Sequence, residues 1–99
     1  MKWRVRTHPG EVLREEFLRP MGLSVHGLAQ ALRVPATRLD AIVKGRRAVT
    51  ADTAVRLGRY FGTSPEFWLN LQSAFNLSLT LARIGRTVRR DIRPHRAAA

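Results

Sequence analysis

Apolar residues recur along this chain at spacings of three and four, the period of amphipathic helices. Leu13 and Phe17 fall on one face of residues 9–18, which form a predicted first helix. Proline interrupts helical hydrogen bonding and glycine favours the turn that follows a helix. We therefore expect Pro20 and Gly22 to end this helix.

Two short helices with a tight break between them are predicted next. Ser24 is a typical N-cap for the first of the pair. Val34 and Pro35 interrupt it, because the residue before a proline avoids the helical region, and the second helix ends at Gly45. The residues expected to face inward from this pair are Leu28, Ala29, Leu32, Leu39 and Ile42.

Two further helices complete the predicted set. Thr50 is suited to cap the fourth helix. The fifth has two candidate starts: Thr63 in a capping box, or Ser64 as N-cap with a proline at the first helical position. We expect this fifth helix to occupy residues 64–84 and to stop before Gly85.

The pattern predicts an all-α fold for residues 9–84, since no convincing strand competes there. In the N-terminal arm, residues 1–8, Trp3 and Val5 alternate with cationic residues. That alternation permits either a short strand, able to add to the sheet edge of a partner, or a disordered arm. Residues 85–99 are rich in Arg and Ala and are predicted to form a flexible basic tail.

Length and composition narrow the possible functions. Ninety-nine residues suit one domain with a small core, and the absence of cysteine excludes disulfides and thiolate chemistry. No apolar run is long enough to span a membrane, and the N-terminus lacks a signal-peptide core, so we expect a cytoplasmic protein. The net charge of +11 predicts a polyanionic partner, nucleic acid before an anionic membrane surface.

One basic block coincides with the pair of short helices. Residues 33–47 hold five basic side chains and one acidic one. Two such helices form the core of a helix-turn-helix, whose second helix enters the major groove of DNA. The candidates for contact with base edges are Ala36, Thr37, Arg38 and Ala41. The candidates for contact with phosphates are Ser24, Arg33, Lys44, Arg46 and Arg47.

The fifth helix is apolar on more than one side, and such a helix must be buried on more than one side. A second copy of the chain is the simplest cover, so we expect a two-fold homodimer. Its recognition helices would lie about 34 Å apart on an inverted-repeat operator of double-stranded DNA. The predicted interface residues are Phe67, Trp68, Leu71, Phe75 and Leu79, with Trp68 serving either there or in the core.

Longer motifs resemble the HigA family of antitoxins, in the Xre/Cro-like (lambda-repressor-like) helix-turn-helix group. They are HPGEVLREEFLRPMGLS at 8–24 and LAQALRVPATRLDAIVKGRRAVTADTAVRLGRYFGTSPEFWLNLQ at 28–72. The resemblance implies a five-helix domain with a C-terminal dimerisation helix, which represses its own operon. It also implies neutralisation of a HigB-like toxin, an mRNA endonuclease. The chain departs from the group at Arg33, where glycine with a positive φ is common.

Other functions find little support in the residues. His8, His26 and His95 lack metal-ligand spacing, and no nucleophile or phosphate-loop motif is present. We therefore expect no catalytic residue, no metal and no cofactor. A stand-alone regulator of the same fold is the main alternative to the antitoxin, ahead of an RNA-binding or membrane-surface protein. The arginines from Arg83 to Arg96 either add non-specific phosphate affinity or enter a minor groove.

Overall fold

The computed structural model describes residues 7–96, which form five helices. The predicted arm falls largely in residues 1–6, outside the described residues. The first helix consists of three consecutive segments, α1 (Pro9–Val12), η1 (Leu13–Leu18) and α2 (Arg19–Met21). The others are α3 (Val25–Leu32), α4 (Ala36–Val43), α5 (Ala51–Phe61) and α6 (Pro65–Asp91). No helix within the described residues is both long and apolar enough to cross a membrane.

The prediction that Pro20 ends the first helix is wrong. The helix continues to Met21 because η1 is π-helical, with the Arg19 amide bonded to the Arg14 carbonyl five residues earlier. This wider winding departs from the i to i−4 ladder that a proline interrupts. Gly22 then ends the helix with a φ of 64°.

Local caps define the starts of α3, α5 and α6, as predicted. The Ser24 hydroxyl accepts from the Gly27 amide at 2.9 Å, and the Thr50 hydroxyl accepts from the Thr53 amide at 3.4 Å. Between the two candidates for α6, Ser64 is the cap, accepting from the Phe67 amide at 3.1 Å. Thr63 instead accepts from the indole nitrogen of Trp68 at 2.8 Å.

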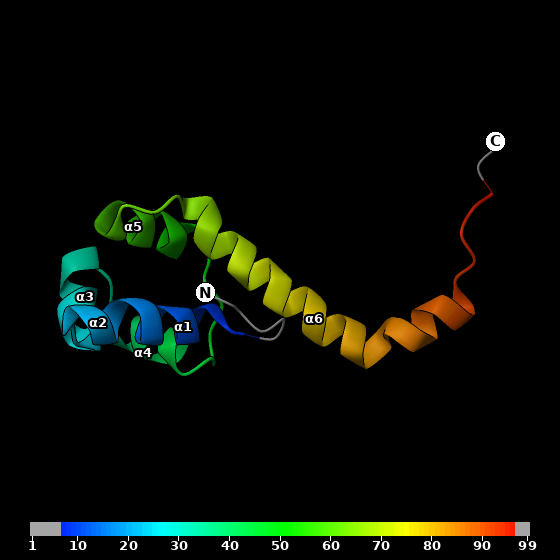
Figure 1. Ribbon diagram of the computed structural model, residues 1–99, viewed down its shortest axis with the longest axis horizontal. Helices are drawn as coiled ribbons and strands as arrows, with labels where there is room; N and C mark the ends of the chain where they lie inside the picture. Colours follow the sequence, from blue (N-terminus) through cyan, green and yellow to red (C-terminus); the bar gives the residue numbers. More distant parts are fainter. Residues whose placement is uncertain (1–6, 97–99) are drawn as a thin grey trace.

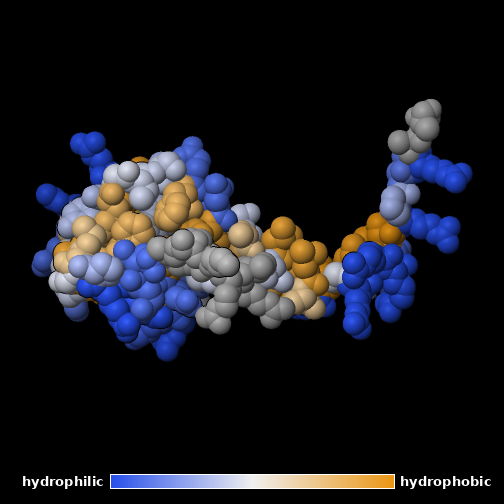
Figure 2. Space-filling model, in the orientation of Figure 1, coloured by the Kyte–Doolittle hydropathy of each residue, from blue (hydrophilic) through white to orange (hydrophobic). Residues whose placement is uncertain are grey.

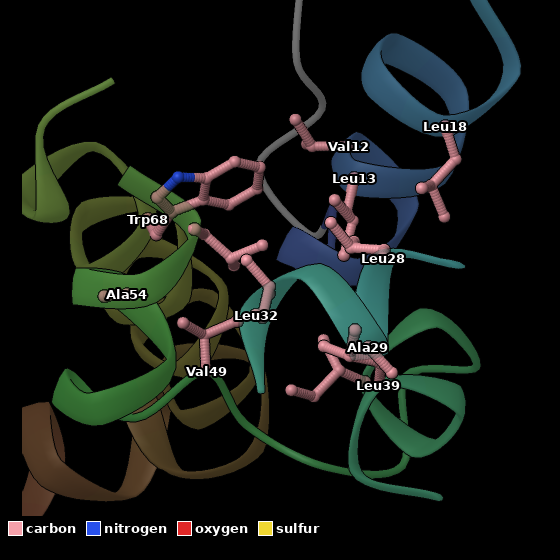
Figure 3. Close-up of a cluster of buried hydrophobic side chains, with 12 residues drawn as sticks. Val12, Leu13, Leu18, Leu28, Ala29, Leu32, Leu39, Val49, Ala54 and Trp68 are labelled. Carbon is pink, nitrogen blue, oxygen red and sulfur yellow. The ribbon is translucent and has the colours of Figure 1, made fainter. Parts of the chain in front are cut away.

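The core lies where α1, α3, α4, α5 and the start of α6 meet (Figure 3). Trp68 is fully buried at its centre, and its ring packs against Phe17 at a centroid distance of 5.1 Å. Gly10 lets α1 approach α4 closely, since a Cβ at this position would clash with the Ile42 carbonyl oxygen. The predicted inner residues of the helix pair are all buried: Leu28, Ala29, Leu32, Leu39 and Ile42.

The second half of α6 projects from the domain (Figure 1). The prediction that α6 stops before Gly85 is wrong, because the helix continues to Asp91. One glycine costs a helix only about 1 kcal/mol, and the residues that follow it tolerate helix well enough to continue. Residues 85–91 of the predicted flexible tail are therefore helical.

Candidate nucleic-acid interface

The turn between α3 and α4 is built on Arg33. This residue has a φ of 61°, in the left-handed region, and the next amide, that of Val34, bonds to the Ala29 carbonyl at 3.1 Å. The side chain of Ala29 is small and buried, which allows α3 and α4 to cross closely. The structure thus forms the predicted helix-turn-helix, with arginine where a glycine would be less strained.

A concave groove of about 440 Å³ lies between the start of α3 and the outer face of α4. It is open to solvent and carries both apolar methyl groups and polar side chains. Its lining residues are Val25, His26, Ala36, Thr37, Asp40, Ala41 and Arg46. A surface with these donors, acceptors and methyl groups has the chemistry that reads base edges in a major groove.

Three of the four predicted base-edge residues line this groove, namely Ala36, Thr37 and Ala41. Arg38 does not. Its Nη1 donates to Asp52 Oδ1 on α5 at 2.9 Å, and its side chain is only 25% exposed. The ion pair holds the Arg38 guanidinium on the α5 side of the recognition helix, so the structure separates it from the other three predicted readers.

The predicted phosphate contacts occupy exposed positions, and one of them, Arg46, also lines the groove. Arg33, Arg46 and Arg47 are exposed, and Lys44 is exposed beside Asp40, with a distance of 3.0 Å from its Nζ to the carboxylate. Ser24 is exposed too, although its hydroxyl already caps α3. The cationic side chains lie where an approaching polyanion would meet them.

Two anchors fix the loop that carries Arg46 and Arg47. At its far end the Val49 amide donates to the buried Oε1 of Gln72 on α6 at 2.8 Å. On its near side His8 is hydrogen-bonded to the Arg47 backbone, while its Nδ1 accepts from the Gly10 amide at 2.8 Å. Burial lowers the pKa of His8, and the bond to the Arg47 backbone partly opposes that shift. The loop is therefore held by both ends of the fold.

The groove also contains residues that sequence reasoning missed. His26 was considered only as a metal ligand, and Asp40 was not among the candidate contacts, yet both line the groove. His26 is the second residue of α3, and its proximity to α4 depends on how the two helices cross. The sequence shows that His26 is polar, but it does not show which of the exposed residues will face the neighbouring helix.

Known proteins share this helix-turn-helix arrangement of α3 and α4. A helix-turn-helix family model matches residues 13–68. Antitoxin HigA of Pseudomonas aeruginosa, solved with the higBA promoter, is 46% identical over 91% of this chain and 98% of its own, with a TM-score of 0.88. The chain belongs to the HigA family of helix-turn-helix proteins.

Two further relatives of this HigA-family chain extend the match. Virulence-associated protein I of Dichelobacter nodosus is 57% identical over 73% of this chain and 67% of its own length. The antitoxin GraA, solved in complex with its operator, is 41% identical with a TM-score of 0.89. That match covers 98% of this chain and 97% of GraA. The GraA match thus includes nearly all of the projecting α6.

Most of the residues predicted for the dimer interface of this HigA-family chain pack within the protomer instead. Trp68 is 0% exposed within the core, so its assignment to a dimer interface is wrong. Phe67 and Leu71 are partly buried against the same core, and Phe75 meets the His8 ring edge-on at 4.9 Å. Leu79, 42% exposed, is the predicted interface residue that remains most accessible.

Proposed function

We propose that the chain is the antitoxin of a type II toxin–antitoxin pair, which binds its own operator as a dimer, represses transcription and neutralises a HigB-like mRNA endonuclease. The observation that carries the DNA-binding part is the groove formed by α3 and α4, in a chain whose HigA relative was solved with its promoter. Repression is steric, because a dimer on the operator blocks access to the promoter.

Base reading falls to the outer face of α4. The Thr37 hydroxyl is exposed and suited to bond a base edge, and the methyl groups of Ala36 and Ala41 are suited to contact a thymine methyl. Arg33, Arg46, Arg47 and Lys44 fix the register by contacting phosphates. A face with two alanines makes few hydrogen bonds to bases, which favours a share of readout through DNA shape.

Dimerisation falls to the projecting half of α6. Leu77, Leu81, Ile84 and Val88 are spaced by four, three and four residues, as in the seam of a coiled coil. Leu77 and Leu81 are 58% and 57% exposed, and Figure 2 shows apolar side chains along this part of the helix. This face lies opposite the stripe that packs into the protomer, so a second copy covers it without disturbing the core.

Two measurements on one preparation test the proposal. The chain is expressed with its neighbouring gene and purified, and the complex is then bound to the DNA upstream of its own operon. We expect a co-purifying toxin and a preference for that DNA over random duplex by at least about 1,000-fold. Preference without a co-purifying toxin would identify a stand-alone regulator instead, and absence of preference would overturn the DNA-binding assignment.

A further inference from the structure

One carboxylate joins the recognition helix to α5. Asp52 Oδ1 accepts from Arg38 Nη1 on α4 at 2.9 Å and from Arg56 Nε on α5, also at 2.9 Å. The two guanidinium groups lower the pKa of Asp52, Arg56 contributing more than Arg38. The carboxylate is therefore ionised at neutral pH and lies between two cations.

The two arginines are held unequally. Arg56 is anchored twice, because its Nη1 also donates to the Leu32 carbonyl at 2.8 Å. Among the described residues, Asp52 is the sole hydrogen-bond partner of the Arg38 guanidinium. Removing the Asp52 charge would therefore leave Arg56 attached to α3. Arg38 would keep at most a weaker bond to a neutral oxygen and would be free to turn towards a phosphate.

The Arg38 side chain would then lie beside the outer face of α4, which is the face proposed to contact bases. Arg38 directly follows Thr37 on α4, and it is on the flank towards α5 rather than in the groove. The Asp52 side chain is 57% exposed, and exposed ion pairs stabilise a fold only slightly. An unpaired guanidinium here would reach for any phosphate, which adds affinity without reading sequence.

We propose that Asp52 is a specificity-determining positioning residue, which holds Arg38 against α5 and so withholds one cation from non-operator DNA. On the operator, contacts in the groove fix the docking of α4 and the ion pair is kept. On random DNA, binding is electrostatic and accepts many orientations, so a free Arg38 would find a phosphate. This inference rests on the proposed operator binding.

The test compares Asp52→Asn with Asp91→Asn. Both variants add one positive charge, but Asp91 pairs with Arg90 at the far end of α6. Affinities for the upstream DNA and for a random duplex of equal length are measured across a salt series. For Asp52→Asn we expect about three- to tenfold tighter random binding, a salt slope steeper by about 1, and less than about a twofold change on the upstream DNA. For Asp91→Asn we expect the ratio of the two affinities to stay unchanged.

A second pair of variants separates positioning from a structural role. In an Arg38→Ala background, Asp52→Asn should leave the ratio of the two affinities unchanged, because the side chain through which Asp52 acts is missing. A persisting effect, or equal tightening on both DNAs, would overturn the inference. If the unmodified chain itself shows no preference for its upstream DNA, the proposed function fails and not merely the role of Asp52.

Discussion

The domain formed by residues 7–76 and the projecting half of α6, residues 77–91, bury apolar surface in different ways. In the domain, Trp68 and the core leucines are buried, and no buried side-chain polar atom among the described residues lacks a partner. On the projecting helix, Leu77 and Leu81 stay more than half exposed. The core of the first region is complete within one chain, whereas the second region leaves a continuous apolar seam without cover, which favours burial against a partner.

Substituting glycine by alanine should have opposite effects in the two regions, and this is the largest expected difference. Gly10→Ala drives a Cβ into the Ile42 carbonyl and should destabilise the domain by about 3 kcal/mol or more. Gly85→Ala meets only the Leu81 side chain at 3.9 Å and should stabilise α6 by about 0.5–1 kcal/mol. Urea unfolding measures both, and equal signs would contradict the close approach of α1 to α4.

A charge placed on the projecting seam should dissociate the dimer. Leu81→Asp would bury an unpaired carboxylate between two copies, which should raise the dimer dissociation constant by at least about 100-fold. Leu79→Asp is the matched control, because Leu79 lies on the opposite face of α6. Sedimentation equilibrium distinguishes them. A larger effect from Leu79 would restore the stripe predicted from sequence and exclude the seam at Leu77, Leu81, Ile84 and Val88.

Breaking the contact between α6 and the loop that carries Arg46 and Arg47 should have a smaller effect on the stability of the domain. Gln72→Leu removes the acceptor of the buried Val49 amide and should cost about 1–3 kcal/mol of stability. It should also weaken operator binding, since the same loop carries Arg46. Asn76→Ala removes only the other partner of Gln72 and should change stability by less than about 0.5 kcal/mol. Calorimetry and DNA titration on the same samples check both statements.

The smallest expected effect is a pH dependence from His8. Its pKa is lowered in the folded chain, so the unfolded chain binds a proton more readily. The contribution of His8 to folding stability is fully present above its unfolded-state pKa of about 6.5. It is lost as the pH falls from there towards the lower pKa of the folded state. His8→Asn keeps a capping side chain without this titration and should flatten the stability curve between those limits. A curve of unchanged shape would contradict the role of the neutral ring.

Local chemistry explains which features could be read from the sequence. Ser24, Thr50 and Ser64 act within three residues of themselves, and the inner faces follow from helical spacing, so the five helices and the helix-turn-helix were predictable. The continuation through Pro20 required a change of helical winding, and the continuation past Gly85 required neighbours that outweigh one glycine.

The candidate site was predictable in part for the same reason. Ala36, Thr37 and Ala41 share one face of one helix, which spacing alone reveals. The position of Arg38 depends on Asp52, fourteen residues away on another helix, and the burial of Trp68 depends on how α6 crosses the domain. Contacts between helices, rather than the helices themselves, determined where prediction and structure differ.

A hydroxyl-radical footprint on the DNA upstream of the chain's own gene tests the central claim most directly. A dimer with two recognition helices should protect two windows on one face of the duplex, their centres about one helical turn or a whole number of turns apart. Leu81→Asp should lose this paired protection at concentrations where Leu79→Asp keeps it. A single protected window for the unmodified chain, or protection that does not depend on Leu81, would contradict the account.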